Sequence, residues 1–220
     1  FDDLAETDCY FYFGQNPGTN SPRFLHNLKD LKDRGGKIVT FNPVIEQGLV
    51  SFVDPQNPLA MMTGKETVIS DQYHQLKSGG DVAAILGLCK VVVEADDEAQ
   101  AAETHEVIDH DFIKQHTTGF EEFIGCCRNT KWADIEQASG LTESALREAA
   151  QVYIDADKTI GVYGMGFTQH THGALNIAMM VNLLLLKGNI GRPGTGCCPV
   201  RGHSNVQGQR TVGIAEKAHL

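Results

Sequence analysis

The sequence has no apolar run long enough to cross a membrane. Its longest such run, IAMMVNLLLL at 177–186, has ten residues and includes an asparagine, whereas a membrane-spanning helix needs roughly 20 apolar residues. The opening residues FDDLAETDCY contain no methionine, no basic segment and no apolar segment of the kind found in signal peptides. We therefore expect no membrane span and no targeting segment in this chain.

Closely spaced cysteine pairs of the CxxC type are also missing. This excludes zinc ribbons and cysteine-ligated clusters built from this chain alone. The 220 residues are 41% hydrophobic, enough to close a core without disulfides, so we expect reduced thiols and a cytoplasmic location. The six cysteines are Cys9, Cys89, Cys126, Cys127, Cys197 and Cys198.

Positive charge is scarce, with 18 Lys and Arg against 28 Asp and Glu. The net charge of −10 argues against nucleic acid as a partner. From Lys158 onward, however, six Lys or Arg stand against Glu216 alone, which favours a compact anion such as a nucleotide in the C-terminal third. The acidic stretch 94–111 is typical of a solvated face or loop.

The first 41 residues predict a βαβ unit. An aromatic strand at 9–14 ends in turn-forming residues, and Ser21 and Pro22 are typical of an N-cap and first helical position. A second strand follows at 37–41. A helix between two short buried strands implies parallel pairing and a right-handed crossover.

The remaining pattern extends this unit into a single α/β domain over residues 1–220, a doubly wound, mostly parallel, Rossmann-like sheet flanked by helices. Residues 188–220 show no regular pattern, and we expect them to form an irregular loop that binds a ligand. The other expected elements are helices starting near Asp81, at 111–116, 119–127 and 131–139, after Thr142 and at 174–187, and a strand at 159–164.

Three polar, glycine-rich segments are candidate ligand sites, because ligands of open parallel sheets bind beyond the carboxyl ends of the strands. The segment 14–23 runs from a strand into a helix whose amino end suits an anion. In 163–173, glycines allow close approach to a ligand, and Gln169, His170 and His172 can hydrogen-bond it. In 197–208, Arg201 suits bidentate recognition of a carboxylate or phosphate.

Together these motifs resemble the molybdopterin-dependent oxidoreductases of the dimethyl sulfoxide reductase superfamily, and among them the alpha subunits of formate dehydrogenases. The motifs are YFGQNPGTNSPR at 12–23, YGMGFTQHTHG at 163–173 and GNIGRPGTGCCPVRGHSNVQGQRTVG at 188–213. The resemblance implies a molybdenum bis(molybdopterin guanine dinucleotide) cofactor, with this region binding one of the two dinucleotides. It also implies that the redox chemistry belongs to the cofactor, whose substrate would be a small, formate-like molecule.

The resemblance assigns roles to particular residues. Arg201 matches the arginine that formate dehydrogenases place beside the molybdenum, and His203 stands where they tend to have a glutamine, which puts formate as the substrate in doubt. Asn42 stands where many relatives carry an aspartate. The expected cofactor-binding residues are Gly14, Asn16, Pro17, Asn20, Asn42, Gly164, Met165, Gly166, Gln169, Gly202, Asn205, Gln207 and Gly208.

The sequence contains neither the family's iron–sulfur cysteine cluster nor its cysteine, selenocysteine or serine ligand to molybdenum. In the family both lie toward the amino terminus of the whole polypeptide. We therefore expect this chain to be a central piece of a longer enzyme, inactive by itself and supplying no metal ligand.

Two other functions are compatible with a sheet of this kind. A nicotinamide-dependent dehydrogenase domain would carry a GxGxxG fingerprint after its first strand, where this chain has GQNPGT. A non-catalytic nucleotide-binding module would bind a nucleotide without redox chemistry.

Overall fold

The core of the protein is a five-stranded parallel sheet in the order β5-β2-β1-β6-β7. The structure is a computed structural model that describes residues 2–54, 58–202, 208, 212 and 213. A separate antiparallel pair joins β3 to β4. The strands are β1 (Cys9–Phe13), β2 (Lys37–Phe41), β3 (Ser51–Val53), β4 (Glu66–Val68), β5 (Gln72–His74), β6 (Thr159–Tyr163) and β7 (Gly196–Pro199).

The strand order makes the sheet doubly wound. The chain moves from β1 outward through β2 to β5, and then returns to place β6 on the other side of β1. The strand order therefore reverses between β1 and β6, which is the position where open α/β sheets bind ligands. The expected Rossmann-like fold is confirmed.

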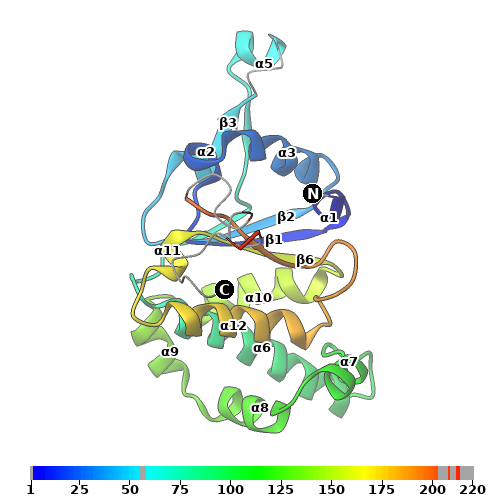
Figure 1. The fold of residues 1–220 in the computed structure, drawn as a ribbon. Coiled ribbons are helices and arrows are strands. Elements are labelled where there is room, and N and C mark those ends of the chain that lie inside the picture. The colour runs from blue at the N-terminus through cyan, green and yellow to red at the C-terminus, as the bar shows by residue number, and fades with distance from the viewer. Residues whose placement is uncertain (1, 55–57, 203–207, 209–211, 214–220) are drawn as a thin grey trace.

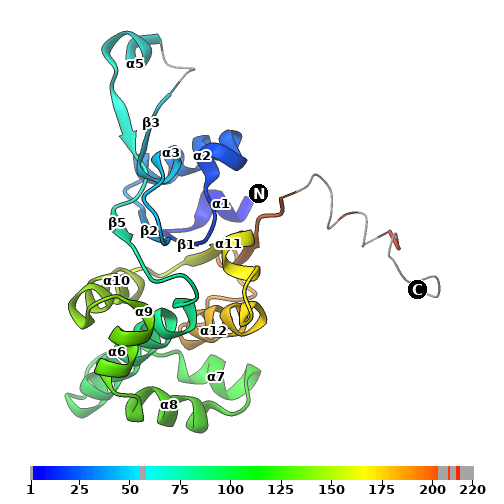
Figure 2. The same cartoon turned by 90° about the vertical axis from the view of Figure 1, so that its left-hand side faces the viewer.

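Helices cover both faces of the sheet (Figure 1). α1, α2 and α3 lie on one side, and the longer α6, α10 and α12 lie on the other, with α7, α8 and α9 packed outside them (Figure 2). The helices are α1 (Asp2–Glu6), α2 (Pro17–Asn20), α3 (Leu25–Asp33), α4 (Gln47–Val50), α5 (Pro58–Thr63), α6 (Asp81–Ala101), α7 (His110–His116), α8 (Phe120–Asn129), α9 (Trp132–Ser139), α10 (Glu143–Asp155), α11 (Met165–Thr168) and α12 (Gly173–Leu186), with a 3-10 turn at Pro22–Phe24.

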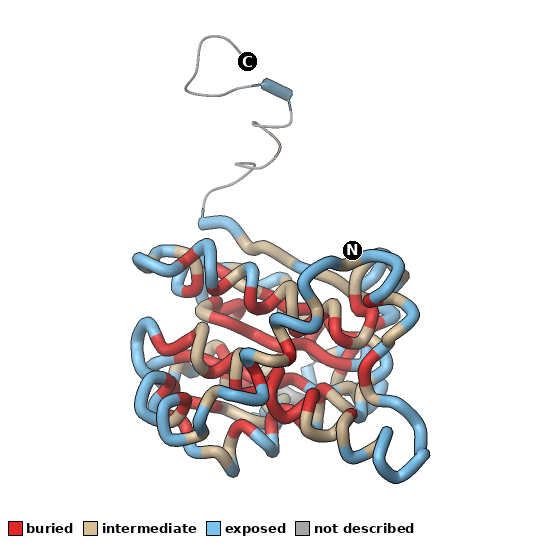
Figure 3. The backbone as a smooth tube through the Cα atoms, turned by 90° about the horizontal axis from the view of Figure 1, so that it is seen from below, coloured by how far each residue is buried: buried red, intermediate tan, exposed pale blue. Residues whose placement is uncertain are grey.

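The fully buried strand β1 supplies both cores. Successive side chains of a strand point to opposite faces, so Phe11 and Phe13 join the core under α6, α10 and α12, whereas Tyr10 and Tyr12 join the core under α3. A strand buried on both faces is typical of a parallel sheet. In Figure 3 the buried residues accordingly concentrate in the middle of the molecule and the exposed ones on its outer turns.

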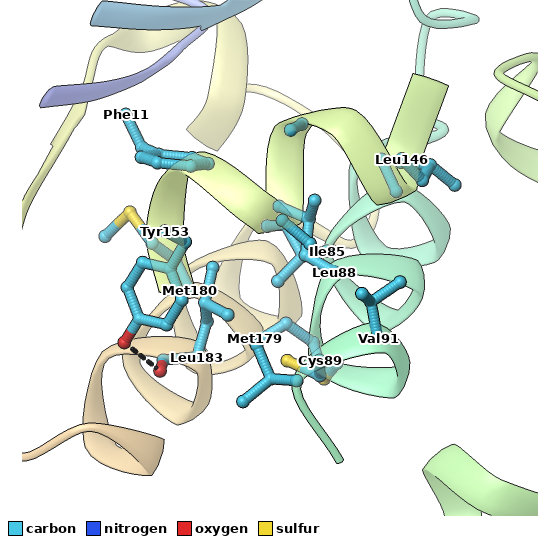
Figure 4. Close-up of a cluster of buried hydrophobic side chains, with 14 of the residues drawn as sticks. Phe11, Ile85, Leu88, Cys89, Val91, Leu146, Tyr153, Met179, Met180 and Leu183 are labelled. Atoms are coloured by element: carbon cyan, nitrogen blue, oxygen red, sulfur yellow. Dashed lines mark hydrogen bonds between the residues drawn. The ribbon is translucent and has the colours of Figure 1, made fainter. Parts of the chain in front are cut away.

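Tyr153 of α10 joins two helices of the larger core (Figure 4). Its ring lies edge-on to Phe11 at 5.9 Å between centroids, and its hydroxyl donates to the carbonyl of Leu183 in α12 at 2.6 Å. The Asn189 amide donates to the same hydroxyl at 3.3 Å. This fully buried phenol is therefore satisfied both as donor and as acceptor.

An arm formed by β3, α5 and β4 projects away from the sheet (Figure 2). It exposes Met61 and Met62, the latter with 86% of its surface accessible. Within the part of the chain that the structure describes, no helix is both long and apolar enough to cross a membrane.

Three expectations from the sequence are wrong in detail. The region after Gly188 is not wholly irregular, because β7 adds a fifth strand beside β6. The helix expected from Ser21 begins as a 3-10 turn, and the Ser21 side chain makes no capping bond. The acidic stretch is not only a solvated face, because Asp96 is buried and accepts bonds from the backbone N–H groups of Val107 and Ile108, both at 2.9 Å.

Replacing Tyr153 with Phe should lower the free energy of unfolding by about 1–3 kcal/mol, because the substitution leaves buried partners unsatisfied. Tyr12→Phe is the matched control, because the Tyr12 hydroxyl is equally buried but has no hydrogen-bond partner among the described residues. That variant should be neutral or more stable. Urea denaturation measures the unfolding free energy of both variants. Equal losses would mean that the hydrogen bonds of the Tyr153 hydroxyl do not stabilise the protein.

Candidate cofactor-binding site

The loops that follow β1 and β6 meet at the carboxyl edge of the sheet, where the strand order reverses. The backbone N–H of Gly164 donates to the carbonyl of Phe13 at 3.2 Å, and that of Gly166 donates to the carbonyl of Gly14 at 3.1 Å. Gly14 also reaches the neighbouring strand, donating to Phe41 at 3.3 Å. Three strand ends are therefore joined at one point.

Glycine is required at this junction for packing. A Cβ at Gly14 would lie 2.5 Å from the backbone nitrogen of Phe167, and one at Gly166 would lie 2.8 Å from the carbonyl oxygen of Gly14. Gly14 also has a positive φ of 55°, which side chains rarely adopt. The sequence suggested that these glycines allow a ligand to approach the backbone. The structure shows that they also allow the loops after β1 and β6 to approach each other.

The amides of Asn16 and Asn42 already have protein partners. Asn16 caps α2 by accepting from the N–H of Thr19 at 3.1 Å, and its Nδ2 donates to Glu46 at 3.0 Å. The Nδ2 of Asn42 donates to the other oxygen of Glu46 at 2.9 Å and to the carbonyl of Val44 at 2.7 Å. These two predicted site residues therefore hold the loops after β1 and β2 together through one carboxylate.

Pro17 and Asn20 are the first and last residues of α2, a single turn of helix. Pro17 is buried and Asn20 is exposed. The segment 14–23 therefore does not run directly into one long helix, as the sequence suggested. It passes through α2 and the 3-10 turn before α3 begins.

Gln15 was missed by the sequence-based selection. It lies between Gly14 and Asn16, directly after β1, and only 6% of its surface is exposed. Both its amide nitrogen and its amide oxygen are buried without a hydrogen-bond partner among the described residues. An unpaired buried amide is costly, so Gln15 is the polar group at this edge that most needs an external partner. Its position immediately after a buried strand was the available signal.

A cleft of about 280 Å³ opens beside the junction. Among its lining residues are five of the predicted cofactor-binding residues, namely Gly14, Asn42, Met165, Gly166 and Gln169. Gly164 belongs to the junction but does not line the cleft, and a Cβ there would lie 2.8 Å from the side chain of Gln15. His170, which the sequence also indicated as a possible hydrogen-bonding group, lines the cleft as well. Sequence reasoning missed the other lining residues, which are Pro43, Leu76, Ser78, Gly79 and Asp81.

Asp81 gives this cleft an unusual carboxyl group. It begins α6, and only 5% of its surface is exposed. Burial raises the pKa of Asp81, although its own backbone N–H and the charge of His170 act in the opposite direction. Burial is therefore the dominant influence on this carboxyl, and it favours the protonated, hydrogen-bond-donating form.

Arg201 and Gly202 lie at the same edge of the sheet, beyond β7. The N–H of Val200 donates to the carbonyl of Tyr163 at 2.8 Å, which aligns this segment with the end of β6. A Cβ at Gly202 would lie 3.8 Å from Met165. Arg201 is exposed and lines a second, larger groove of about 930 Å³ rather than the cleft beside the junction.

The remaining predicted residues are less informative. Gly208 accepts a hydrogen bond from the N–H of Val212 at 3.1 Å. His203, Asn205 and Gln207 lie outside the described residues. Among the described residues there is no cluster of three or more His, Cys, Asp or Glu side chains suited to a metal ion.

A family model for molybdopterin oxidoreductases matches residues 1–216. The chain belongs to this family. Its relatives include protein YdeP of Escherichia coli, 48% identical over 216 residues, and an uncharacterized oxidoreductase of Mycobacterium tuberculosis, 39% identical over 215 residues. Each alignment covers 98% of this chain. A formate dehydrogenase subunit alpha of Methanocaldococcus jannaschii is 30% identical over 212 residues, or 96% of this chain.

The family relatives are much longer proteins. This chain spans 28% of YdeP and 27% of each of the other two. Among solved structures, acetylene hydratase from Pelobacter acetylenicus shares the fold with a TM-score of 0.64 and 18% identity, over 89% of this chain and 23% of that one. The expected resemblance to formate dehydrogenase alpha subunits is confirmed.

Replacing Gly14 with Ala should destabilise the protein by at least about 1 kcal/mol more than Gly35→Ala. Both glycines have a positive φ, so both variants carry the left-handed strain of an L-residue. Only Gly14 also meets backbone atoms, since a Cβ at Gly35 would have nothing within 4 Å. Urea denaturation compares the two, and equal losses would mean that the loop contact is not tight.

Replacing Asp81 with Asn should stabilise the protein increasingly as the pH rises above the ordinary range of an aspartate. A raised pKa means that the folded state holds the proton more tightly, so wild-type stability is lost as the pH rises through that pKa. Unfolding free energies from pH 3 to 7 test this.

The control for this prediction is Asp97→Asn, whose effect should have the opposite sign. The pKa of Asp97 is lowered by its hydrogen bond to Arg128, so the wild type gains stability from this group at higher pH. If the difference in stability between Asp81→Asn and the wild type does not vary with pH, the pKa of Asp81 is not raised by burial.

Proposed function

We propose that this chain is the cofactor-binding portion of a molybdenum oxidoreductase, and that it holds one guanine dinucleotide arm of a bis(molybdopterin guanine dinucleotide) cofactor at the carboxyl edge of its sheet. Membership of the molybdopterin oxidoreductase family supports a pterin cofactor. The observation that carries the location is Gln15, whose buried amide lies at the reversal of strand order and has no hydrogen-bond partner among the described residues.

The groups at this edge suit a large heterocyclic ligand with many hydrogen-bonding atoms. Gln15 offers two donors and an acceptor, and the cleft beside it adds Gln169, Ser78 and the buried carboxyl of Asp81. Backbone approach is close because Gly14 and Gly166 have no side chains. The residues present therefore fit a pterin dinucleotide.

The cofactor would supply two-electron transfer when it is bound. This chain would hold the cofactor in place and orient the substrate. In the proposal, Arg201 holds an anionic substrate by paired hydrogen bonds, and His203, two positions later in the sequence, is the second proposed catalytic residue. The iron–sulfur cluster and the metal ligand typical of the family would belong to other parts of a longer protein.

A nicotinamide-dependent dehydrogenase is the weaker alternative. It shares the sheet, but the loop after β1 reads GQNPGT and lacks the GxGxxG fingerprint. The first turn after β1 also differs, because Asn16 and Pro17 open a single-turn helix there rather than a long helix. A nucleotide-binding module without redox chemistry would lack molybdenum.

Replacing Gln15 with Leu should lower the molybdenum and pterin content of the full-length protein by at least about tenfold. The reason is that the variant loses the hydrogen bonds between the amide and the cofactor, and a loss of about 1.4 kcal/mol in binding free energy weakens binding tenfold. The same change should leave the unfolding free energy of the cofactor-free protein unchanged or higher, because the amide makes no hydrogen bond within the part of the chain that the structure describes. Elemental analysis and pterin fluorescence measure the first effect, and urea denaturation the second.

Gln151→Leu on α10 is the matched control, since its amide donates to Asp155 on an exposed helix surface rather than in the loops after β1 and β6. It should retain full cofactor content. A wild-type protein that contains neither molybdenum nor pterin would overturn the proposed function, and a fully loaded Gln15→Leu variant would overturn the role of Gln15.

A further inference from the structure

The larger groove lies on the opposite side of the sheet from α6. Its two walls are the segment that enters α3, from Ser21 to Asn27, and the end of β7, from Cys198 to Arg201. Both walls are at the carboxyl ends of parallel strands, the same edge as the cofactor cleft. The groove, at about 930 Å³, is more than three times the volume of that cleft.

The walls of the groove are largely apolar. Phe24 stands on the α3 side, where its ring packs against Tyr10 at 6.3 Å between centroids. Pro199 and Val200 stand on the β7 side, and Val200 packs against the same buried cluster as Phe24. Phe24 and Val200 are held in place by the buried cluster behind them, so they present a preformed apolar surface.

The charged residues of the groove all have one sign. Arg23, Arg201 and the ionisable His26 line it, and no Asp or Glu is among its lining residues in the described part of the chain. In a protein of net charge −10, a groove with two guanidinium groups and no carboxylate is complementary to an anion.

We propose that this groove binds the substrate, and that the substrate is an organic carboxylate with an apolar body rather than formate. The carboxylate pairs with the guanidinium groups of Arg201 and Arg23, and the hydrocarbon part lies against Phe24, Pro199 and Val200. Formate has no carbon chain to fill such a groove. This inference rests on the proposed function, because it names the class of substrate for the proposed molybdenum enzyme.

Binding can be measured without turnover. Isothermal titration calorimetry on the full-length, cofactor-loaded protein would use formate, acetate, butanoate and hexanoate. Burial of each methylene should tighten the Kd by about twofold to fourfold, so hexanoate should bind at least tenfold more tightly than acetate. Hexanol, which matches the chain but lacks the charge, should bind at least tenfold more weakly than hexanoate.

Variants locate the site. Arg201→Gln and Arg23→Gln should each weaken hexanoate binding about tenfold, whereas Arg128→Gln, which removes the same charge from α8, should change it less than twofold. Phe24→Leu should reduce the dependence on chain length and leave the affinity for acetate within twofold.

The results separate this inference from the proposed function. A Kd that does not depend on chain length, or hexanoate binding that survives both groove arginine substitutions, would overturn the inference even if molybdenum is present. Binding of the dinucleotide itself in this groove, seen in a structure of the loaded protein, would also overturn it. Conversely, a metal-free protein that shows the predicted hexanoate series would retain the groove and lose the molybdenum function.

Discussion

The structure depends on the close approach of two loops at the point where the strand order reverses. Gly14 and Gly166 bring the backbones after β1 and β6 into hydrogen-bonding contact, and any side chain there would separate them. The contact joins β1 to β6, the fourth strand of the five-stranded sheet in chain order, so it brings together two loops that lie far apart in the sequence. The polar groups around it lie at one edge of the sheet, and Gln15 is buried there without a hydrogen-bond partner in the described residues 2–54 and 58–202.

The two faces of this edge have different chemical characters. On the α6 side the cleft contains amides, a hydroxyl and the buried carboxyl of Asp81, which suits a ligand read through hydrogen bonds. On the α3 side the groove combines apolar walls with arginines, which suits an anion with a hydrocarbon part. Under the two proposals, one sheet edge would bind a cofactor on one side and a substrate on the other, because the layers of helices differ on its two sides.

Much of the fold could be predicted from the sequence, because buried strands, helix caps and glycine stops are local signals. The βαβ unit, the helix capped by Thr142 and the buried helix ending at Gly188 all appear as expected. The strand β7 could not be predicted, because Gly196–Pro199 carries two cysteines between a glycine and a proline and has no strand pattern of its own. It becomes a strand only because the exposed edge of β6 offers hydrogen bonds.

The candidate site, like the fold, was predictable from the sequence only in part. Sequence alone determined the family, the parallel sheet and the polar segments after its strands, since these depend on the order of residues. Only the tertiary structure decided which of those residues stay free for a ligand. Asn16 and Asn42 donate to Glu46, whereas the buried amide of Gln15 has no partner among the residues that the structure describes. Arg201 lines a separate groove. The reason is that hydrogen-bond partners come from distant parts of the chain, so whether a polar group is satisfied is settled only by packing.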